Sequence, residues 1–386
     1  MDRYAGMDFK AHNHEVLEIW NAWEKGCPIR MPMITGISDR FFVLGKETNP
    51  GNVSFFDYSH DKALMFDMQC GFARWRQFNI TGDHEMGVPE AGYTINVDFQ
   101  NYYEAAWLGC EVRFPKDEVP YAVPLLNDEN KNLLFDRGLP DPFGGFLAEA
   151  REFYDYFVER SKKTRIEGTK IGHVGTPFMG LDGMFTLACE LRGAEKLCVD
   201  MLEDRDFYHS LMEYLTQATI ARIRAWRKYT GEPEKSESFS FADDSIMLLS
   251  REMYRDYVLP YHKKLALGIS TMKERGGAHL CGDATRHFSL IRDSLNIYSF
   301  DTGFPVAHRE LCEELGPEVC IQGGPAVGFI TASSCDEIEV ESKRIIESVK
   351  SIAPRFVFRD GNDLPPGTPL KKIEALYAAC KKYGLY

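Results

Sequence analysis

The sequence has no block of basic residues, and its acidic residues outnumber its basic ones. It holds 58 Asp and Glu against 45 Lys and Arg, a formal net charge of −13. Proteins that bind nucleic acid present a basic face to the phosphates, so this balance argues against a nucleic-acid partner. It also disfavours a strongly anionic substrate, unless a local basic pocket holds it.

Long apolar runs and paired cysteines are also missing. No stretch approaches the ~20 apolar residues of a membrane span, and residues 1–10 lack the apolar core of a signal peptide. The ten cysteines form no CxxC pair. They are best interpreted as reduced thiols, most of them small core residues. We therefore expect a cytoplasmic protein with no membrane partner.

The chain has no low-complexity run, short repeat or Gly/Ser linker, and from residue 170 strands and helices alternate. Strands are expected at residues 29–35, 169–177, 236–244, 278–283, 298–303, 318–324 and 355–363. Helices are expected at residues 147–162, 195–229, 250–276, 288–293, 309–315 and 334–352, and after Pro369. Ser250 should cap its helix and Pro260 should kink it.

This alternation indicates βαβ units and a parallel sheet. Together with the length of 386 residues it predicts an α/β fold, a (β/α)8 TIM barrel. Residues 1–386 would form one domain, with residues 1–28 as an N-terminal extension. The first units of the barrel would lie in the irregular, aromatic-rich N-terminal part.

In such a barrel the active site lies where the strands end and the βα loops begin. The expected strands end in polar or metal-binding side chains: Asp243, Asp244, His279, Cys281, Asp283, Asp301, Gln322, Asp360, Asn362 and Asp363. A purely structural barrel has little reason to repeat this pattern. The sequence therefore favours an enzyme over a scaffold protein.

His279 and Cys281 form the sharpest local feature. Residues two apart on a strand point to the same side, so both side chains can reach one zinc ion. Zinc binds imidazole nitrogen at ~2.0 Å and thiolate sulfur at ~2.3 Å. The spacing also fits a hydrogen-bonded core histidine, His279, beside a small buried thiol, Cys281.

Several other residues are candidates from spacing alone. Cys320 lies two residues before Gln322 and is the natural third ligand, although it could also be an apolar filler. Glu237 and Asp243 are oxygen candidates, while Asp244 fits a helix-capping or turn role. Asp301 is expected to be functional, because a buried carboxylate is costly without a partner or a task.

Common catalytic and cofactor motifs are absent. There is no GxSxG and no dinucleotide fingerprint, and the glycine pair at residues 323–324 lacks the P-loop lysine. The aromatic stretch at residues 99–107 suits protein core or a subunit interface, which leaves a homodimer open, or the packing of an aromatic ligand.

Several segments, in order, resemble the uroporphyrinogen decarboxylase superfamily. They are LLSREMYRDYVLPYH at 248–262, AHLCGDATRHF at 278–288, YSFDTGFP at 298–305, VCIQGGP at 319–325 and the closing segment at 356–384. The resemblance covers residues 170–386 well and the N-terminal part poorly. It implies a (β/α)8 barrel.

Two branches of that superfamily make different predictions. True uroporphyrinogen decarboxylase grips its polycarboxylate substrate with an arginine-rich loop, but residues 36–42 here read GISDRFF, with one arginine. The branch of zinc-dependent, corrinoid-linked methyltransferases uses an H-x-C pair, matched by His279 and Cys281, and a later cysteine. That cysteine is missing here, because residues 360–363 read DGND. Either Cys320, Glu237 or Asp363 takes its place as the third ligand, or the protein has no catalytic zinc.

The resemblance therefore implies a zinc- and corrinoid-dependent methyltransferase. It would move a methyl group from a small methoxylated or methylated compound to cobalamin carried on a separate corrinoid protein. His279, Cys281 and Cys320 would bind zinc, Asp243 and Asp301 would orient substrate or supply a proton, and Gln322 and Asp283 would bind substrate.

The alternative enzyme is a metal-free decarboxylase of a small carboxylic acid. In that case Asp301 and Asp243 would steer protonation, and His279 would only donate a hydrogen bond.

Overall fold

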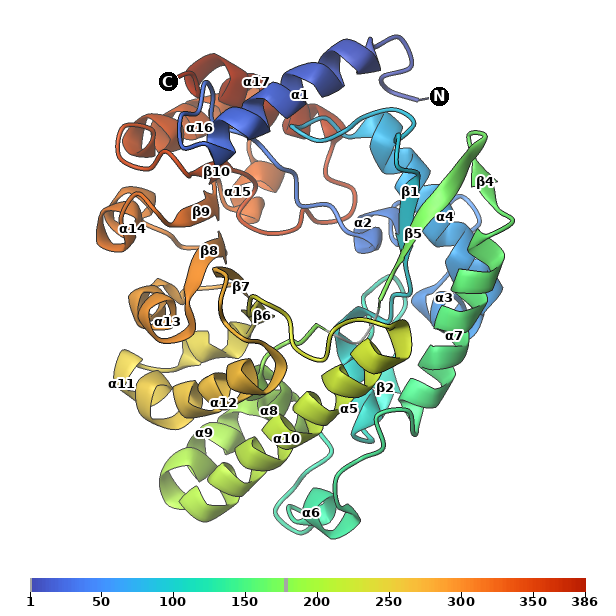
Figure 1. Cartoon of the computed structure of the whole chain (residues 1–386), viewed down its shortest axis with the longest axis vertical. Coiled ribbons are helices and arrows are strands. Elements are labelled where there is room, and N and C mark those ends of the chain that lie inside the picture. The colour runs from blue at the N-terminus through green and yellow to red at the C-terminus, as the bar shows by residue number, and fades with distance from the viewer. Residues whose placement is uncertain (1, 177–179) are drawn as a thin grey trace.

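The computed structural model describes residues 2–176 and 180–386. Its strands lie around a common centre with the helices outside them, as Figure 1 shows. The strands β6 to β10 occupy one side of this ring, and β1 and β5 occupy the other. This arrangement is the α/β barrel that the sequence predicts.

One side of the ring is a parallel five-stranded sheet in the order β10-β9-β8-β7-β6. Its strands are β6 (Phe241–Ala242), β7 (Gly276–Leu280), β8 (Ile297–Thr302), β9 (Cys320–Gly323) and β10 (Val357–Phe358). The register pairs His279 with Asp301 on β8, and Asp301 in turn with Gln322 on β9. The polar residues of three strands therefore lie at similar depths in the barrel.

The other side holds β1 (Tyr93–Asn96) parallel to β5 (Thr169–Gly175), and β4 (Arg165–Ile166) extends β5 as an antiparallel arm. The strands β2 (Val112–Arg113) and β3 (Tyr121–Ala122) form a separate antiparallel pair. Residues 29–35 are extended but form only isolated bridges, including Met33 to Phe358 in parallel. This segment closes the barrel against β10 as its first strand position.

Helices surround the strands. Before β6 they are α1 (Phe9–Glu24), α2 (Asp39–Val43), α3 (Phe55–His60), α4 (Lys62–Asn79), α5 (Tyr103–Trp107), α6 (Leu133–Arg137), α7 (Phe146–Ser161), α8 (Met184–Arg192), α9 (Ala194–Glu203) and α10 (Arg205–Thr230). After β6 they are α11 (Arg251–Met253), α12 (Leu259–Ile269), α13 (Phe288–Leu295), α14 (His308–Leu315), α15 (Val327–Ala332), α16 (Cys335–Val349) and α17 (Leu370–Tyr383). None of the described helices is both long and apolar enough to cross a bilayer.

The single helix predicted over residues 195–229 is wrong, because the structure has two helices, α9 and α10. Asp204 separates them with a non-helical backbone, and its side chain accepts a hydrogen bond from the Phe207 amide at 3.4 Å. The apolar positions keep a nearly helical spacing across this break. The pattern therefore hides a helix cap that only the local hydrogen bond reveals.

The helix predicted from Ser250 is interrupted and ends early. Ser250 caps α11 as expected, accepting a hydrogen bond from the Met253 amide at 3.2 Å. A π-helical turn at Tyr254–Val258 then precedes α12, which has Pro260 in its first turn and ends at Ile269. The π turn accommodates the missing proline donor. Residues 270–275 are therefore not helical.

Several predicted strands are shorter in the structure. Of residues 236–244 only Phe241–Ala242 pair as a strand, and of residues 355–363 only Val357–Phe358 do. The strand over residues 169–177 ends at Gly175, and its predicted last residue, Pro177, lies outside the described residues. Helices α7, α13 and α14 and the Ser334 capping box of α16 confirm the sequence pattern.

The aromatic stretch at residues 99–107 belongs to the core. Phe99 and Tyr102 are each 2% exposed. The Phe99 ring lies 4.9 Å from that of Phe146 and 5.1 Å from that of Phe153. These aromatic residues therefore join the segment before α5 to α7, as the core interpretation predicts.

Acid should weaken this fold through His287. The residue is fully buried, and burial, followed by the nearby Arg286, lowers its pKa to about 4, against ~6.5 in an unfolded chain. Between these values the unfolded state binds more protons, so stability falls as the pH falls, by up to about 1.4 kcal/mol per pH unit. Urea unfolding measures the free energy of unfolding of the wild type and of His287→Gln. We expect the excess of the wild-type value over that of the variant to decrease as the pH is lowered from 6.5 to 4.5. A constant gap would contradict this.

Candidate metal and substrate site

A cavity of about 510 Å³ opens at the carboxyl ends of the strands. Its lining comes from the segments that follow the strands: Ser38, Asp39, Arg40, Asp98, Gln100, Asn101, Asp182, Ala242, Asp244, His279, Cys281, Asn362, Asp363, Leu364, Pro365 and Pro366. These include the loop after the first strand position and the loop after β10, where parallel barrels place their active sites.

Three side chains at this cavity could hold one metal ion. One ligand atom from each of Asp244, His279 and Cys281 lies within 4.8 Å of the others, and no other such group occurs in residues 2–176 and 180–386. His279 Nε2 is 3.0 Å from Cys281 Sγ. Asp244 also accepts a hydrogen bond from the Cys281 amide at 2.7 Å, which fixes the two strand ends relative to each other.

Other side chains orient these three groups. His279 Nδ1 donates to Asp301 Oδ2 at 2.6 Å, which leaves Nε2 facing Cys281. Arg359, only 7% exposed, holds the same carboxylate oxygen at 2.7 Å through Nη1. The Asn362 side-chain amide donates to Cys281 Sγ at 3.0 Å. Carboxylate groups behind ligating histidines commonly fix ring orientation in metal sites.

The two central groups have shifted pKa values. Burial lowers the pKa of His279, but hydrogen bonds with Asp301 and Cys281 outweigh it and raise the pKa to about 11. Burial raises the pKa of the Cys281 thiol, and the neighbouring His279 offsets part of that rise. Desolvation and paired charges of this kind are typical of functional sites.

The donor set fits zinc. Imidazole nitrogen, thiolate sulfur and carboxylate oxygen are its usual ligands. Catalytic sites have three protein ligands and leave the fourth position for water or substrate, and the group here has three beside an open cavity.

Asp243, predicted to be catalytic, does not line the cavity, and both of its carboxylate oxygens have hydrogen-bond partners. It is fully buried, and Oδ1 accepts from the Thr186 amide at 2.8 Å and its hydroxyl at 2.7 Å. Its other oxygen accepts from the Phe185 amide at 3.0 Å and contacts His262 Nε2 at 2.9 Å. The side chain thus anchors the start of α8 and points away from the cavity. Asp244, which the sequence assigned to a turn, takes the place beside His279.

Cys320 and Gln322 do not line this cavity. Both line a second cavity, described below, and Gln322 donates to Ser299 Oγ at 3.3 Å. Glu237 is exposed and precedes β6, so it does not reach the metal group. The ligand role predicted for Cys320 and the substrate role predicted for Gln322 therefore find no counterpart in the lining of the first cavity.

Three predicted residues have intermediate outcomes. Asp283 lies on the loop after β7, with 58% of its side chain exposed, and is paired with Arg286 at 3.7 Å; it does not line the cavity. Asp363 lines the cavity but stands outside the metal group. Asp301 is the carboxylate that supports His279.

The cavity wall holds acidic residues that the sequence did not predict, because they do not lie directly at the ends of the strands identified from the sequence. Asp39, Asp98 and Asp182 line it, against a single arginine, Arg40. Burial, and then the nearby Glu104, raise the pKa of Asp182 to about 7, so it can donate a proton near neutral pH. Burial, and then Asp98, hold the pKa of Asp39 well above its usual range. Of the segments that carry these residues, the sequence pointed only to the loop at residues 36–42, which contains Asp39 and Arg40.

Comparisons with known proteins show the family of the chain. The family model described as uroporphyrinogen decarboxylase (URO-D) matches residues 94–383. The chain therefore belongs to that family, as the sequence motifs indicated.

Individual relatives are methyltransferases. The chain is 27% identical to a methylated-thiol–coenzyme M methyltransferase of Methanosarcina mazei, but the match spans only 52% of each chain, about half the relative's length. It is 21% identical to a methylcobamide:CoM methyltransferase of the same organism, over 82% of this chain and 89% of the relative. A solved methyltransferase structure from Methanosarcina mazei matches with a TM-score of 0.63 and 17% identity, over 95% of this chain and 98% of that one. This structural match establishes the fold.

The two neighbouring aspartates should respond differently to the same change. Asp243→Asn places an amide group against the donors of α8, so we expect it to lower the free energy of unfolding by about 3 kcal/mol. Asp244→Asn keeps an acceptor for the Cys281 amide and should cost less than about 1 kcal/mol. Urea unfolding of the metal-free proteins measures both. Equal losses would contradict the assignment of structure to Asp243 and chemistry to Asp244.

Proposed function

We propose that this protein is a corrinoid-dependent methyltransferase with zinc bound by His279, Cys281 and Asp244. The observation that carries the proposal is the group of these three residues at the mouth of the barrel, beside a cavity that can admit a substrate. The methyltransferase names of the relatives support it. The substrate would be a small methoxylated or methylated compound.

A zinc ion bound there would act as a Lewis acid on the heteroatom that carries the methyl group, which stabilises the departing oxygen, nitrogen or sulfur. The residues around it have separate tasks. Asp301 and Arg359 hold the His279 ring in place, and Asn362 orients the Cys281 sulfur. Asp182 has a pKa near neutrality and can protonate the leaving group.

The methyl acceptor in this proposal is reduced cobalamin carried by a separate protein. An unactivated methyl ether or amine has a poor leaving group, and the described lining residues offer no free strong nucleophile. Because the cavity lies at the end of the barrel, a partner protein can present its corrinoid to it. Two relatives are named methylcobamide:CoM methyltransferases, and this supports a corrinoid protein as the partner.

The acidic wall also bears on the substrate. The lining holds several carboxyl groups, Asp98 and Asp363 among them, and one arginine, Arg40, so it does not offer the cluster of cations that a carboxylate-rich ligand needs. This argues against uroporphyrinogen. It also weakens the decarboxylase alternative, because the substrate would be an acid and Asp243, one of the two carboxylates assigned to protonation, does not reach the cavity.

Metal analysis tests the first part of the proposal. We expect about one zinc per chain in protein purified without chelators, and Cys281→Ser should remove most of it because thiolate is a strong zinc ligand. Cys320→Ser is the matched control and should keep the metal, because Cys320 lies outside the group. Well-folded wild-type protein that neither retains nor takes up zinc would refute the metal assignment.

Methyl transfer to free cobalamin tests the second part. The protein is mixed with Co(I) cobalamin and a panel of methoxylated aromatics and methylated amines. We expect methyl-cobalamin to form with at least one donor, and the change in cobalamin absorbance measures its formation. His279→Ala should slow this at least 100-fold while its thermal stability stays close to that of the wild type. Without Co(I) no donor should react. Release of carbon dioxide from a carboxylic acid, uroporphyrinogen included, with no methyl-cobalamin from any donor, would favour the decarboxylase instead.

A further inference from the structure

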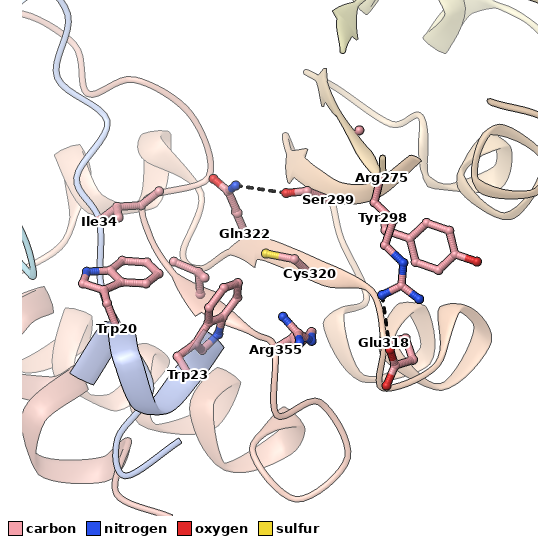
Figure 2. A pocket seen from close by; sticks show the side chains of 12 residues that line it. Trp20, Trp23, Ile34, Arg275, Tyr298, Ser299, Glu318, Cys320, Gln322 and Arg355 are labelled. Atoms are coloured by element: carbon pink, nitrogen blue, oxygen red, sulfur yellow. Dashed lines mark hydrogen bonds and ion pairs between the residues drawn. The ribbon is translucent and has the colours of Figure 1, made fainter. Parts of the chain in front are cut away.

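A second cavity, of about 280 Å³, opens at the opposite end of the barrel. Figure 2 shows the side chains that line it. It is lined where the strands begin, by Gly276, Tyr298, Cys320 and Val357, whereas the metal group lies where they end. Helix α1 contributes Trp20 and Trp23 to one side. The proposed methyl transfer uses none of these residues.

The side formed by α1 is aromatic, and one of its rings is held by a hydrogen bond. The rings of Trp20 and Trp23 lie 5.5 Å apart with an interplanar angle of 76°. Trp20 is held by its indole N–H, which donates to the Asp83 carbonyl at 2.7 Å. Ile34 and Val357 add apolar surface. Such a wall suits the face of a ring, and the modest volume suits one ring rather than a drug-sized ligand.

Two donors beside this wall lack acceptors. The Trp23 indole N–H is buried and has no hydrogen-bond partner in the structure. The Arg355 guanidinium lies 5.3 Å from the Trp23 ring centroid, and no carboxylate of the described residues comes within ion-pair distance of it. Arg275, at the rim, differs from Arg355 because it forms an ion pair with Glu318 at 3.2 Å. In a chain with net charge −13, an arginine without a carboxylate partner beside an orphan donor indicates an anionic ligand.

The inner end of the cavity is neutral. Gln322 and Ser299 are joined to each other by a hydrogen bond of 3.3 Å. Burial raises the pKa of the Cys320 thiol to about 11, so it carries no charge at neutral pH. No lining group at this end therefore competes with an anion for Arg355.

We propose that this cavity is a binding site for a small aromatic carboxylate. The ring would lie against Trp20 and Trp23, and the carboxylate would accept from the Trp23 indole N–H and from Arg355. Aromatic stacking accounts for the wall, and the carboxylate gives both unpaired donors an acceptor. The site is independent of the metal group.

Benzoate is the probe, used with the full-length protein. Titration should quench tryptophan fluorescence saturably, with a dissociation constant in the millimolar range or below, confirmed by calorimetry. Benzamide, which has the same shape without the charge, should bind at least tenfold more weakly. Arg355→Gln should weaken benzoate at least tenfold, and the matched variant Arg275→Gln should change it less than twofold.

Further variants keep the test decisive. Trp23→Phe retains a ring but removes the N–H, so it should weaken benzoate several-fold even if Arg355→Gln fails to fold. Cys281→Ser, which tests the zinc proposal, should leave benzoate binding unchanged. Absence of saturable benzoate binding, equal binding of benzamide, or loss of binding in Cys281→Ser but not in Arg355→Gln would overturn the proposal.

Discussion

One carboxylate oxygen connects the parts of the site. Asp301 Oδ2 accepts from His279 at 2.6 Å and from Arg359 at 2.7 Å, so it ties the ends of β7, β8 and β10 together. Because this oxygen accepts the hydrogen bond from Nδ1, the ring presents Nε2 to Cys281. Without this bond the imidazole could rotate, and the metal group would lose its geometry. The loop after β10, which carries Asn362, is placed by the same arrangement.

Strand periodicity explains which parts of the site the sequence could reveal. His279 and Cys281 are two residues apart on one strand end, so their joint orientation followed from the sequence, and the structure brings them within 3.0 Å. Asp243 and Asp244 are adjacent just after β6, where Asp243 precedes and Asp244 begins a short 3-10 helix, and their side chains have different partners. The sequence could not decide which faced inward, since that depends on the strand's register with β7. The register and the contacts of α8 with Asp243 resolve it.

Other parts depend on contacts between distant segments. The later cysteine of the methyltransferase branch is absent, and Asp244, which lies beside His279 and Cys281, comes from a segment that follows a different strand, so local spacing gives no sign of it. Asp39, Asp98 and Asp182 meet only because three separate loops converge on the cavity. The fold itself was more accessible, because alternating apolar runs and helices define a barrel even where individual strands shorten to two residues, as in β6 and β10. Cys320 and Gln322 share a face as expected, but both line the second cavity and not the acidic one.

The two ends of the barrel thus differ in chemistry, with an acidic cavity at one and an aromatic cavity with an unpaired arginine at the other. At the acidic end, we propose, three different donor atoms hold one zinc ion. X-ray absorption of the zinc-loaded protein tests it most directly, because it counts ligands by element. The account predicts one sulfur at ~2.3 Å and the remaining ligands nitrogen or oxygen at ~2.0–2.2 Å. Two or more sulfur ligands, or none, would contradict it.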